Sequence, residues 1–351
     1  MRILIPLLGF APQGGYRVLS ELANSWARIG HKCTFLVPAT SRPPYFPTSA
    51  EVIRCDRRGR IITERSSLKQ RGYDSLLSLW SGLGRIGHNY DIILANHCLT
   101  AWPVRWRNAG NAKKFYYIQA DEPLYYSPLV HPIKHLMARM SYRFGLTQIA
   151  NSAVYRRRGI KPVAVIPPGI DLSIFTPKHN LGRFASEREI VLGTIGRTEP
   201  YKGTPTVLAA FRLLSQENQH LKMNVGFGNT PPADDIVITP ISGDAALAKY
   251  YRSVDVLVVA CTGQYGAPHY PVIEAMASGT PVVHTGYYPG SDGNSWEAEN
   301  TSVAAVAEAI RQVISSTELE RHAKVASARK TVEAELTWEV VASKFIEHFN
   351  A

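Results

Sequence analysis

Short apolar runs alternate with longer amphipathic stretches along most of the chain. The run at 254–260 is β-branched and unalternating, which is typical of a strand buried on both faces of a sheet. Similar runs predict strands at 2–10, 32–38, 91–96, 114–118, 148–151, 190–196, 223–227, 236–238 and 281–284. Between them apolar residues recur at helical spacing, first at Val18, Leu19, Leu22, Ala23 and Trp26. The alternation predicts an α/β fold.

The length of the chain indicates two such domains. At 351 residues it exceeds one ordinary domain. Residues 166–188 combine three prolines and a glycine with a polar tail, which is typical of a linker. Residues 75–86 are apolar with basic flanks, so they predict either a core helix or an amphipathic helix lying on a membrane.

A glycine loop follows the first predicted strand. Residues 11–15 read Ala-Pro-Gln-Gly-Gly and lead into a helix, which is the usual opening of a nucleotide-binding α/β unit. The G-x-G-x-x-G pattern is absent, so a dinucleotide is not implied. Gly14 and Gly15 would let the backbone approach a ligand closely, and the alternative is a simple turn.

Two cations follow the strand at 190–196. Arg197 and Lys202 precede a predicted helix with Thr204 as its cap and Pro205 at its start. Cations beside a helix N-terminus suit a diphosphate, and the alternative is a solvated turn.

The stretch at 251–285 predicts strand, loop, short helix and strand. Pro271 would open the helix and Gly279 would end it, with Glu274 in its first turn. The loop between the first strand and the helix of this stretch lies beyond the carboxyl ends of parallel strands, where open α/β sheets bind ligands. A carboxylate there can bind the vicinal diol of a ribose. The alternative is that Glu274 only complements the helix dipole.

Two adjacent carboxylates, Asp121 and Glu122, follow the strand at 114–118. Carboxylates at a strand end are candidates to meet a substrate. His131 and His135 flank a predicted basic helix at 131–145 and are interpreted as solvated residues.

Charge is distributed unevenly. Residues 1–185 hold 26 Lys and Arg against 9 Asp and Glu, a net +17, whereas the remainder holds 13 against 19, a net −6. This asymmetry favours an anionic membrane face or a lipid-phosphate acceptor for the first half. No nucleic-acid motif is present. Scattered cysteines (Cys33, Cys55, Cys98, Cys261) indicate neither disulfides nor a zinc site.

Residues 271–283, PVIEAMASGTPVV, resemble the donor-site signature of glycosyltransferase family 4. Glu274 matches one signature glutamate, and Gly266 stands where the family has another. Residues 196–203 are similar to the family's Gly-Arg-x-x-x-x-Lys-Gly element, and 166–177 to its interdomain segment. Residues 119–123 lack the family's histidine-aspartate pair and look like the variant of the rhamnosyltransferase-like branch, which favours a nucleotide-linked deoxyhexose.

The resemblance implies the α/β GT-B fold, with two Rossmann-like domains facing across a cleft. The acceptor-binding domain would comprise 1–170 and a returning C-terminal helix at 336–351. A linker at 171–188 and a donor-binding domain at 189–335 would complete the chain. The family's last helix crosses back onto the first domain.

The resemblance also implies a retaining, metal-independent transfer of a sugar from a nucleotide-sugar, with no cofactor. Arg197 and Lys202 would stabilise the leaving phosphate, and Asp121 or Glu122 would face the acceptor or the sugar. The remaining donor contacts would come from Gly14, Gly15, Glu274, Tyr270 and Pro271.

The acceptor would be a glycan or lipid-linked molecule in cell-surface polysaccharide synthesis. The expected location is cytoplasmic, peripheral at the inner face of the plasma membrane. Two alternatives stay open because Gly266 replaces a glutamate and the histidine is missing. One is a non-catalytic sugar-nucleotide-binding subunit, and the other is a sugar-nucleotide epimerase of similar architecture.

Overall fold

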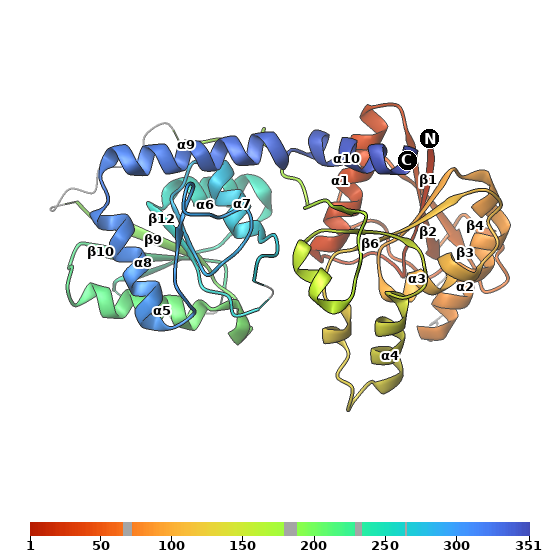
Figure 1. Ribbon diagram of the computed structural model, residues 1–351, viewed down its shortest axis with the longest axis horizontal. Helices are drawn as coiled ribbons and strands as arrows, with labels where there is room; N and C mark the ends of the chain where they lie inside the picture. The colour runs from red at the N-terminus through yellow and green to blue at the C-terminus, as the bar shows by residue number, and fades with distance from the viewer. Residues whose placement is uncertain (66–71, 179–187, 229–233, 264) are drawn as a thin grey trace. The chain divides into compact units, whose positions relative to one another are not determined.

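The computed structural model describes residues 1–65, 72–178, 188–228, 234–263 and 265–351 (Figure 1). The chain divides into two compact units. The first comprises Met1–Gly169 and Trp338–Ala351, and the second comprises Ile170–Thr337. Residues 171–178 of the expected linker belong to the second unit, and 179–187 lie outside the described residues.

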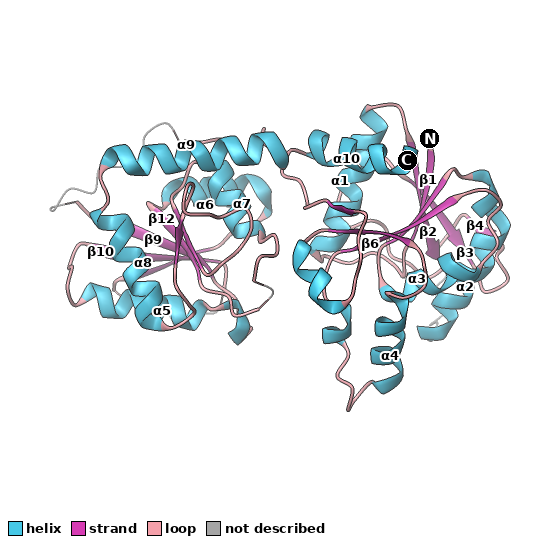
Figure 2. Cartoon of the chain, viewed as in Figure 1, coloured by secondary structure: helices cyan, strands magenta, loops and turns pink. Residues whose placement is uncertain are grey.

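The first unit is built on an eight-stranded sheet in the order β4-β3-β2-β1-β5-β6-β7-β8 (Figure 2). Its pairings are parallel except that between β3 and β4. The chain runs outward from β1 on one side and resumes at β5 on the other, so the sheet reverses its order between these strands. The strands are β1 (Arg2–Pro6), β2 (Lys32–Pro38), β3 (Glu51–Cys55), β4 (Ile61–Ile62), β5 (Ile92–Ala95), β6 (Lys113–Ile118), β7 (Thr147–Ala150) and β8 (Ala164–Val165).

Helix α10 packs against α1 within the first unit, although the two lie at opposite ends of the chain. Trp26 of α1 is fully buried, and its Nε1 donates to the Ala342 carbonyl at 3.2 Å. Its ring contacts Phe345 and Phe349 of α10. The predicted apolar face of α1 is thereby confirmed as a core face. The helices of this unit are α1 (Gly14–Arg28), α2 (Gly72–Ile86), η1 (Gly87–Asn89), α3 (Cys98–Trp106), η2 (Glu122–Tyr125), α4 (Pro132–Ser141), η3 (Ala153–Arg158) and α10 (Trp338–Asn350).

Helix α2 is a core helix and not an amphipathic helix lying on a membrane, the other prediction made from its sequence. Leu79 and Leu83 are buried in the same cluster as Leu36 of β2. Tyr73 and Leu77 remain exposed. The apolar residues of α2 therefore serve mainly to cover the sheet.

The second unit holds a six-stranded parallel sheet in the order β11-β10-β9-β12-β13-β14. Its order reverses between β9 and β12. The strands are β9 (Ile190–Ile195), β10 (Leu221–Gly226), β11 (Ile236–Thr239), β12 (Val256–Val259), β13 (Val282–His284) and β14 (Trp296–Glu297). The helices are η4 (Pro200–Lys202), α5 (Thr204–Ser215), α6 (Gly243–Ser253), α7 (Tyr270–Ala277), α8 (Val303–Ser315) and α9 (Glu318–Glu335).

Strand β14 was not expected from the sequence. It has only two residues, Trp296 and Glu297, paired with Val283 and His284. A strand this short has no run of apolar residues to reveal it. Of these two strand residues, Trp296 is buried in the core, whereas Glu297 is exposed.

His284 makes the stability of the second unit sensitive to acid. Its Nδ1 accepts from the Gly286 and Tyr287 amides at 3.0 and 3.1 Å, and burial lowers its pKa to about 4. The unfolded chain protonates this imidazole near pH 6.5, whereas the folded chain does not. Stability is therefore complete above about pH 6.5 and falls by up to about 1.4 kcal/mol per pH unit as pH drops towards the folded pKa.

Urea unfolding at about pH 7 and about pH 5 tests this expectation. At these pH values most carboxylates stay ionised, so histidine dominates the difference. His269, whose pKa is lowered to about 3, contributes a change of the same sign, so equal free energies of unfolding at the two pH values would contradict the lowered pKa of both histidines.

Candidate functional site

The second unit's candidate site lies where its sheet reverses order, beyond the carboxyl ends of β9 and β12. The loop that follows β9 and the loop that follows β12 are joined there, since the Thr262 amide donates to the Tyr201 carbonyl at 2.9 Å. The Cys261 thiol likewise donates to the Lys202 carbonyl at 3.2 Å. The two loops border a cavity of about 160 Å³ lined by Tyr201, Lys202, Cys261, Gly263, Ala267, Pro268, His269 and Tyr287.

Gly203 allows these loops to approach each other. It has a φ of +79°, and a Cβ added to it would lie 2.0 Å from the Ala260 carbonyl oxygen. Gly203 is also the N-cap of α5, which corrects the prediction that Thr204 caps this helix. The Thr204 hydroxyl instead accepts from the Arg197 amide at 3.0 Å. Thr204 thus fixes the backbone of the loop that carries the cations.

Arg197 and Lys202 lie on this same loop. The Arg197 guanidinium binds Glu199 through two contacts, Nη2–Oε1 at 2.9 Å and Nε–Oε2 at 3.2 Å. This pairing holds the pKa of the exposed Glu199 at about 2. The pKa of the partly buried His269 is lowered to about 3, first by burial and then by Lys202 and Arg197. Both cations therefore act on the cavity that His269 lines.

Glu274 lies on α7 and is almost fully buried. Its Oε2 accepts from the Tyr251 hydroxyl at 2.8 Å. The helix begins at Tyr270 with Pro271 as its second residue, so Glu274 is in the second turn and not the first as predicted. The ribose contact of Glu274 stays a prediction, as do the donor contacts of Tyr270 and Pro271.

Gly266 has a backbone conformation that explains why no glutamate stands there. Its φ is +78°, in the left-handed region where residues other than glycine are strained. Its amide donates to the Gly286 carbonyl at 2.6 Å. This turn requires a glycine and leaves the site without the family's second carboxylate.

Substituting Glu274→Gln tests the ribose role. The change keeps the size of the side chain but removes its charge, and we expect nucleoside diphosphate affinity to fall about tenfold. Calorimetry with the bare nucleotide measures this. Tyr251→Phe is the matched control, because it removes only the internal hydrogen bond. Equal affinity in Glu274→Gln and the parent would assign Glu274 to the helix alone.

The first unit's candidate site also lies where its sheet reverses order. Gly14 and Gly15 begin α1 after β1, His97 follows β5, and Gln119 follows β6. Gly15, His97 and Gln119 line a cavity of about 340 Å³ together with Leu8, Gln13, Tyr16, Asn96, Ala120, Glu122 and Tyr125, whereas Gly14 is not among its lining residues. Half of these lining residues carry a side-chain amide or hydroxyl group, Glu122 adds a carboxylate, and none is Lys or Arg, so the cavity suits a hydroxyl-rich ligand without a phosphate.

The adjacent Asp121 and Glu122 border different cavities. Glu122 borders the cavity beside Gly15 and is almost fully buried. Asp121 borders a second cavity of about 530 Å³, which Arg139 and Arg143 make basic. The structure therefore brings only Glu122 together with Gly15. The catalytic roles of both carboxylates stay predictions.

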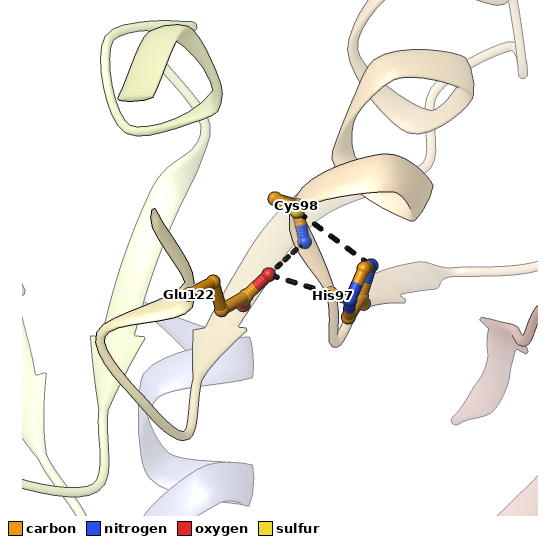
Figure 3. A group of neighbouring side chains, drawn as sticks. All are labelled: His97, Cys98 and Glu122. Atoms are coloured by element: carbon orange, nitrogen blue, oxygen red, sulfur yellow. Dashed lines mark hydrogen bonds and ion pairs between the residues drawn. The ribbon is translucent and has the colours of Figure 1, made fainter. Parts of the chain in front are cut away.

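Glu122, His97 and Cys98 form a compact cluster (Figure 3). The carboxylate accepts from the Cys98 amide at the start of α3 and from the Tyr116 hydroxyl at 2.9 Å. His97 Nδ1 accepts from the Leu99 amide at 3.1 Å. Burial, followed by the charge of Glu122, raises the pKa of the Cys98 thiol and keeps it protonated. The cluster caps a helix, and its chemistry does not fit a metal site.

His97 is the residue that sequence reasoning missed. Because Nδ1 accepts a hydrogen bond, the neutral ring carries its proton on Nε2. Nε2 lies 3.4 Å from the Tyr126 hydroxyl and 3.9 Å from Glu122 Oε2. Its position directly after a predicted strand was a signal, but its proximity to Glu122 depends on strand order.

Comparisons with known proteins agree with this geometry. A family model described as Glycosyltransferase Family 4 matches residues 12–174, and one described as Glycosyl transferases group 1 matches 189–316. A D-inositol 3-phosphate glycosyltransferase of Segniliparus rotundus is 32% identical over 144 residues, covering 34% of this chain and 31% of that protein. The matches span less than half the length of such curated relatives.

Several solved structures resemble the whole chain. Sucrose-phosphate synthase from Thermosynechococcus elongatus has a TM-score of 0.76 at 18% identity, covering 100% of this chain and 98% of that one. Anabaena HepE, solved with UDP and glucose, has a TM-score of 0.71 at 17% identity, covering 100% of each chain. The α/β GT-B fold predicted from the sequence is confirmed, and the chain belongs to glycosyltransferase family 4.

Proposed function

We propose that the protein is a retaining, metal-independent glycosyltransferase that uses a nucleotide-sugar donor. The observation that carries this proposal is the position of Arg197 and Lys202 beyond β9, just before α5. Helix-start amides that lack internal partners favour a phosphate, although in α5 Pro205 has no N–H and the Val207 amide donates to the Gly203 carbonyl. Two cations at that point can stabilise the charge that develops on a departing diphosphate, in place of a divalent ion.

The donor can bind this loop by replacing Glu199 as the partner of Arg197. Arg197 is bound to the exposed Glu199, and such exposed pairs contribute little to stability. A diphosphate offers more negative charge and can displace Glu199. The complex of HepE with UDP and glucose is consistent with a nucleotide-sugar donor for a chain of this fold.

The acceptor is assigned to the first unit. In the cavity beside Gly15, His97 Nε2–H can donate to an acceptor hydroxyl, and Glu122 orients the ring only indirectly, by fixing the start of α3. In the basic cavity, Arg139 and Arg143 suit an acidic group on the acceptor. The curated relatives are named for a phosphorylated acceptor, D-inositol 3-phosphate. We propose a phosphorylated glycan or a lipid-linked acceptor in polysaccharide synthesis, with Asp121 beside its reacting hydroxyl.

The proposed location is cytoplasmic and peripheral to the membrane. Across the described ranges, no helix has both the length and the apolar character needed to cross a bilayer. A peripheral enzyme of this kind would take a cytosolic donor and a membrane-bound acceptor.

A non-catalytic sugar-nucleotide-binding subunit is the second candidate. The left-handed turn at Gly266 favours it, because the turn removes a carboxylate from the sugar pocket. The epimerase alternative has no observation in its favour. Thermal unfolding with a panel of nucleotide-sugars, deoxyhexose donors included, tests the donor class. A donor at 100 times its dissociation constant adds about 2.7 kcal/mol, and stabilisation by none of them would contradict both candidates.

A further inference from the structure

An unusual number of large apolar side chains is exposed on one segment of the first unit, residues 124–140. Leu129 is 94% exposed and Ile133 is 74% exposed. Scattered exposed apolar residues are ordinary, but a contiguous group of this kind marks an interaction surface. We call this group the apolar segment, and it consists of Leu124, Tyr125, Leu129, Val130, Ile133, Leu136 and Met140.

The apolar segment is held in place by small and polar residues. Ala138 and Ser141 are the buried residues of α4. His135 Nδ1 donates to the Tyr126 carbonyl at 2.9 Å, which fixes the loop before α4 against the helix. Figure 1 shows α4 and this loop extending from the body of the first unit, away from its sheet.

Helix α4 therefore presents the opposite arrangement to an ordinary surface helix. Ile133, Leu136 and Met140 recur at a spacing of three and four residues, so they form one stripe. In an ordinary surface helix that stripe would face the core, but here it is exposed. The stripe is therefore available to a partner from outside the unit.

The charge around the apolar segment selects the partner. Lys134, Arg139 and Arg143 are exposed on or next to α4. The sequence contains no acidic residue between Glu122 and Asp171. A second copy of the chain would bring like charges together at a symmetric interface. An anionic surface that accepts apolar side chains matches both the exposed apolar residues and the positive charge around them.

We propose that the apolar segment docks the protein on an anionic lipid bilayer. The apolar side chains would enter the boundary between head groups and acyl chains, as in interfacial amphipathic helices. Lys134, Arg139 and Arg143 would lie against the lipid phosphates. This assigns the expected membrane contact to residues 124–140 and not to α2, whose leucines cover the sheet.

Docking here would bring the basic cavity to the membrane. That cavity is lined by Leu124 of the apolar segment together with Asp121, Arg139 and Arg143. A lipid-linked acceptor could then present its head group to Asp121 without leaving the bilayer. This consequence rests on the proposed function, whereas the docking itself does not.

Co-sedimentation of the full chain with vesicles tests the proposal. We expect binding to vesicles of phosphatidylcholine with phosphatidylglycerol, and little to phosphatidylcholine alone. Binding should weaken as salt is raised. The double substitution Leu129→Ser and Ile133→Ser should lower the bound fraction about tenfold or more, because it removes the deepest apolar contacts. Tyr45→Ser with Val163→Ser is the matched control, since both residues are exposed in the same unit outside the apolar segment.

Each outcome decides the matter. No binding of the parent chain at low salt, or equal binding by Leu129→Ser/Ile133→Ser, would overturn the proposal. So would a parent dimer that this variant dissociates, because the segment would then join two copies. Thermal unfolding should be unchanged, since both side chains are exposed. Donor hydrolysis without vesicles should also be retained, so a failure of docking is separable from a failure of the proposed transferase activity.

Discussion

Replacing both Arg197 and Lys202 by alanine is expected to lower turnover by at least about 10²-fold, a typical loss when a charge-stabilising group is removed. Both side chains lie on the loop between β9 and α5, and both depress the pKa of His269. Steady-state kinetics with the donor that stabilises the chain measures the loss.

The matched control is Arg311→Ala. Arg311 is an arginine of the same unit that binds Glu217 through two contacts, at 2.7 and 3.1 Å, as Arg197 binds Glu199. Its loss should leave turnover unchanged. Equal turnover in the Arg197→Ala/Lys202→Ala variant and the parent would refute the role of the cations.

Gly203→Ala is expected to destabilise the second unit by more than about 3 kcal/mol. The substitution meets two penalties, a strained φ of +79° and an overlap with the Ala260 carbonyl oxygen. The added Cβ would overlap a backbone atom and not a movable side chain. The clash can therefore be relieved only if the end of β12 moves away from the loop that carries Arg197 and Lys202. Donor affinity should fall together with stability.

Gly243→Ala separates these two penalties. Gly243 has the same φ of +79°, but a Cβ there would meet nothing within 4 Å. It should cost only about 1–2 kcal/mol, the price of the left-handed conformation. Chemical denaturation of both variants measures the difference. If Gly203→Ala were no worse than Gly243→Ala, the close approach of the two loops would be wrong.

The strands that could be predicted from the sequence are those with apolar runs. The run at 32–38 coincides with β2, because a strand buried on both faces must be apolar throughout. Strand β14 was missed because two residues carry no such pattern. The cap of α5 was misassigned to Thr204 because a threonine before Pro205 is an ordinary capping signal.

Candidate residues within one motif were predictable, whereas their partners were not. Arg197 and Lys202 lie on one loop between β9 and α5, as their spacing in the sequence predicts. The proximity of His97 to Glu122 follows from the pairing of β5 with β6, which local patterns do not specify. The exposure of Ile133 and Leu136 was equally hidden, because an apolar stripe has the same spacing whether a core or a membrane covers it.

The most direct test of the central claim follows the sugar itself. The full chain is incubated with the stabilising nucleotide-sugar and a phosphorylated or lipid-linked acceptor, with and without EDTA, and products are followed by mass spectrometry and proton NMR. We predict release of nucleoside diphosphate and a glycosylated acceptor with the donor's anomeric configuration, unaffected by EDTA and lost in the Arg197→Ala/Lys202→Ala variant. A donor that binds but is neither transferred nor hydrolysed would contradict the account and identify a binding subunit.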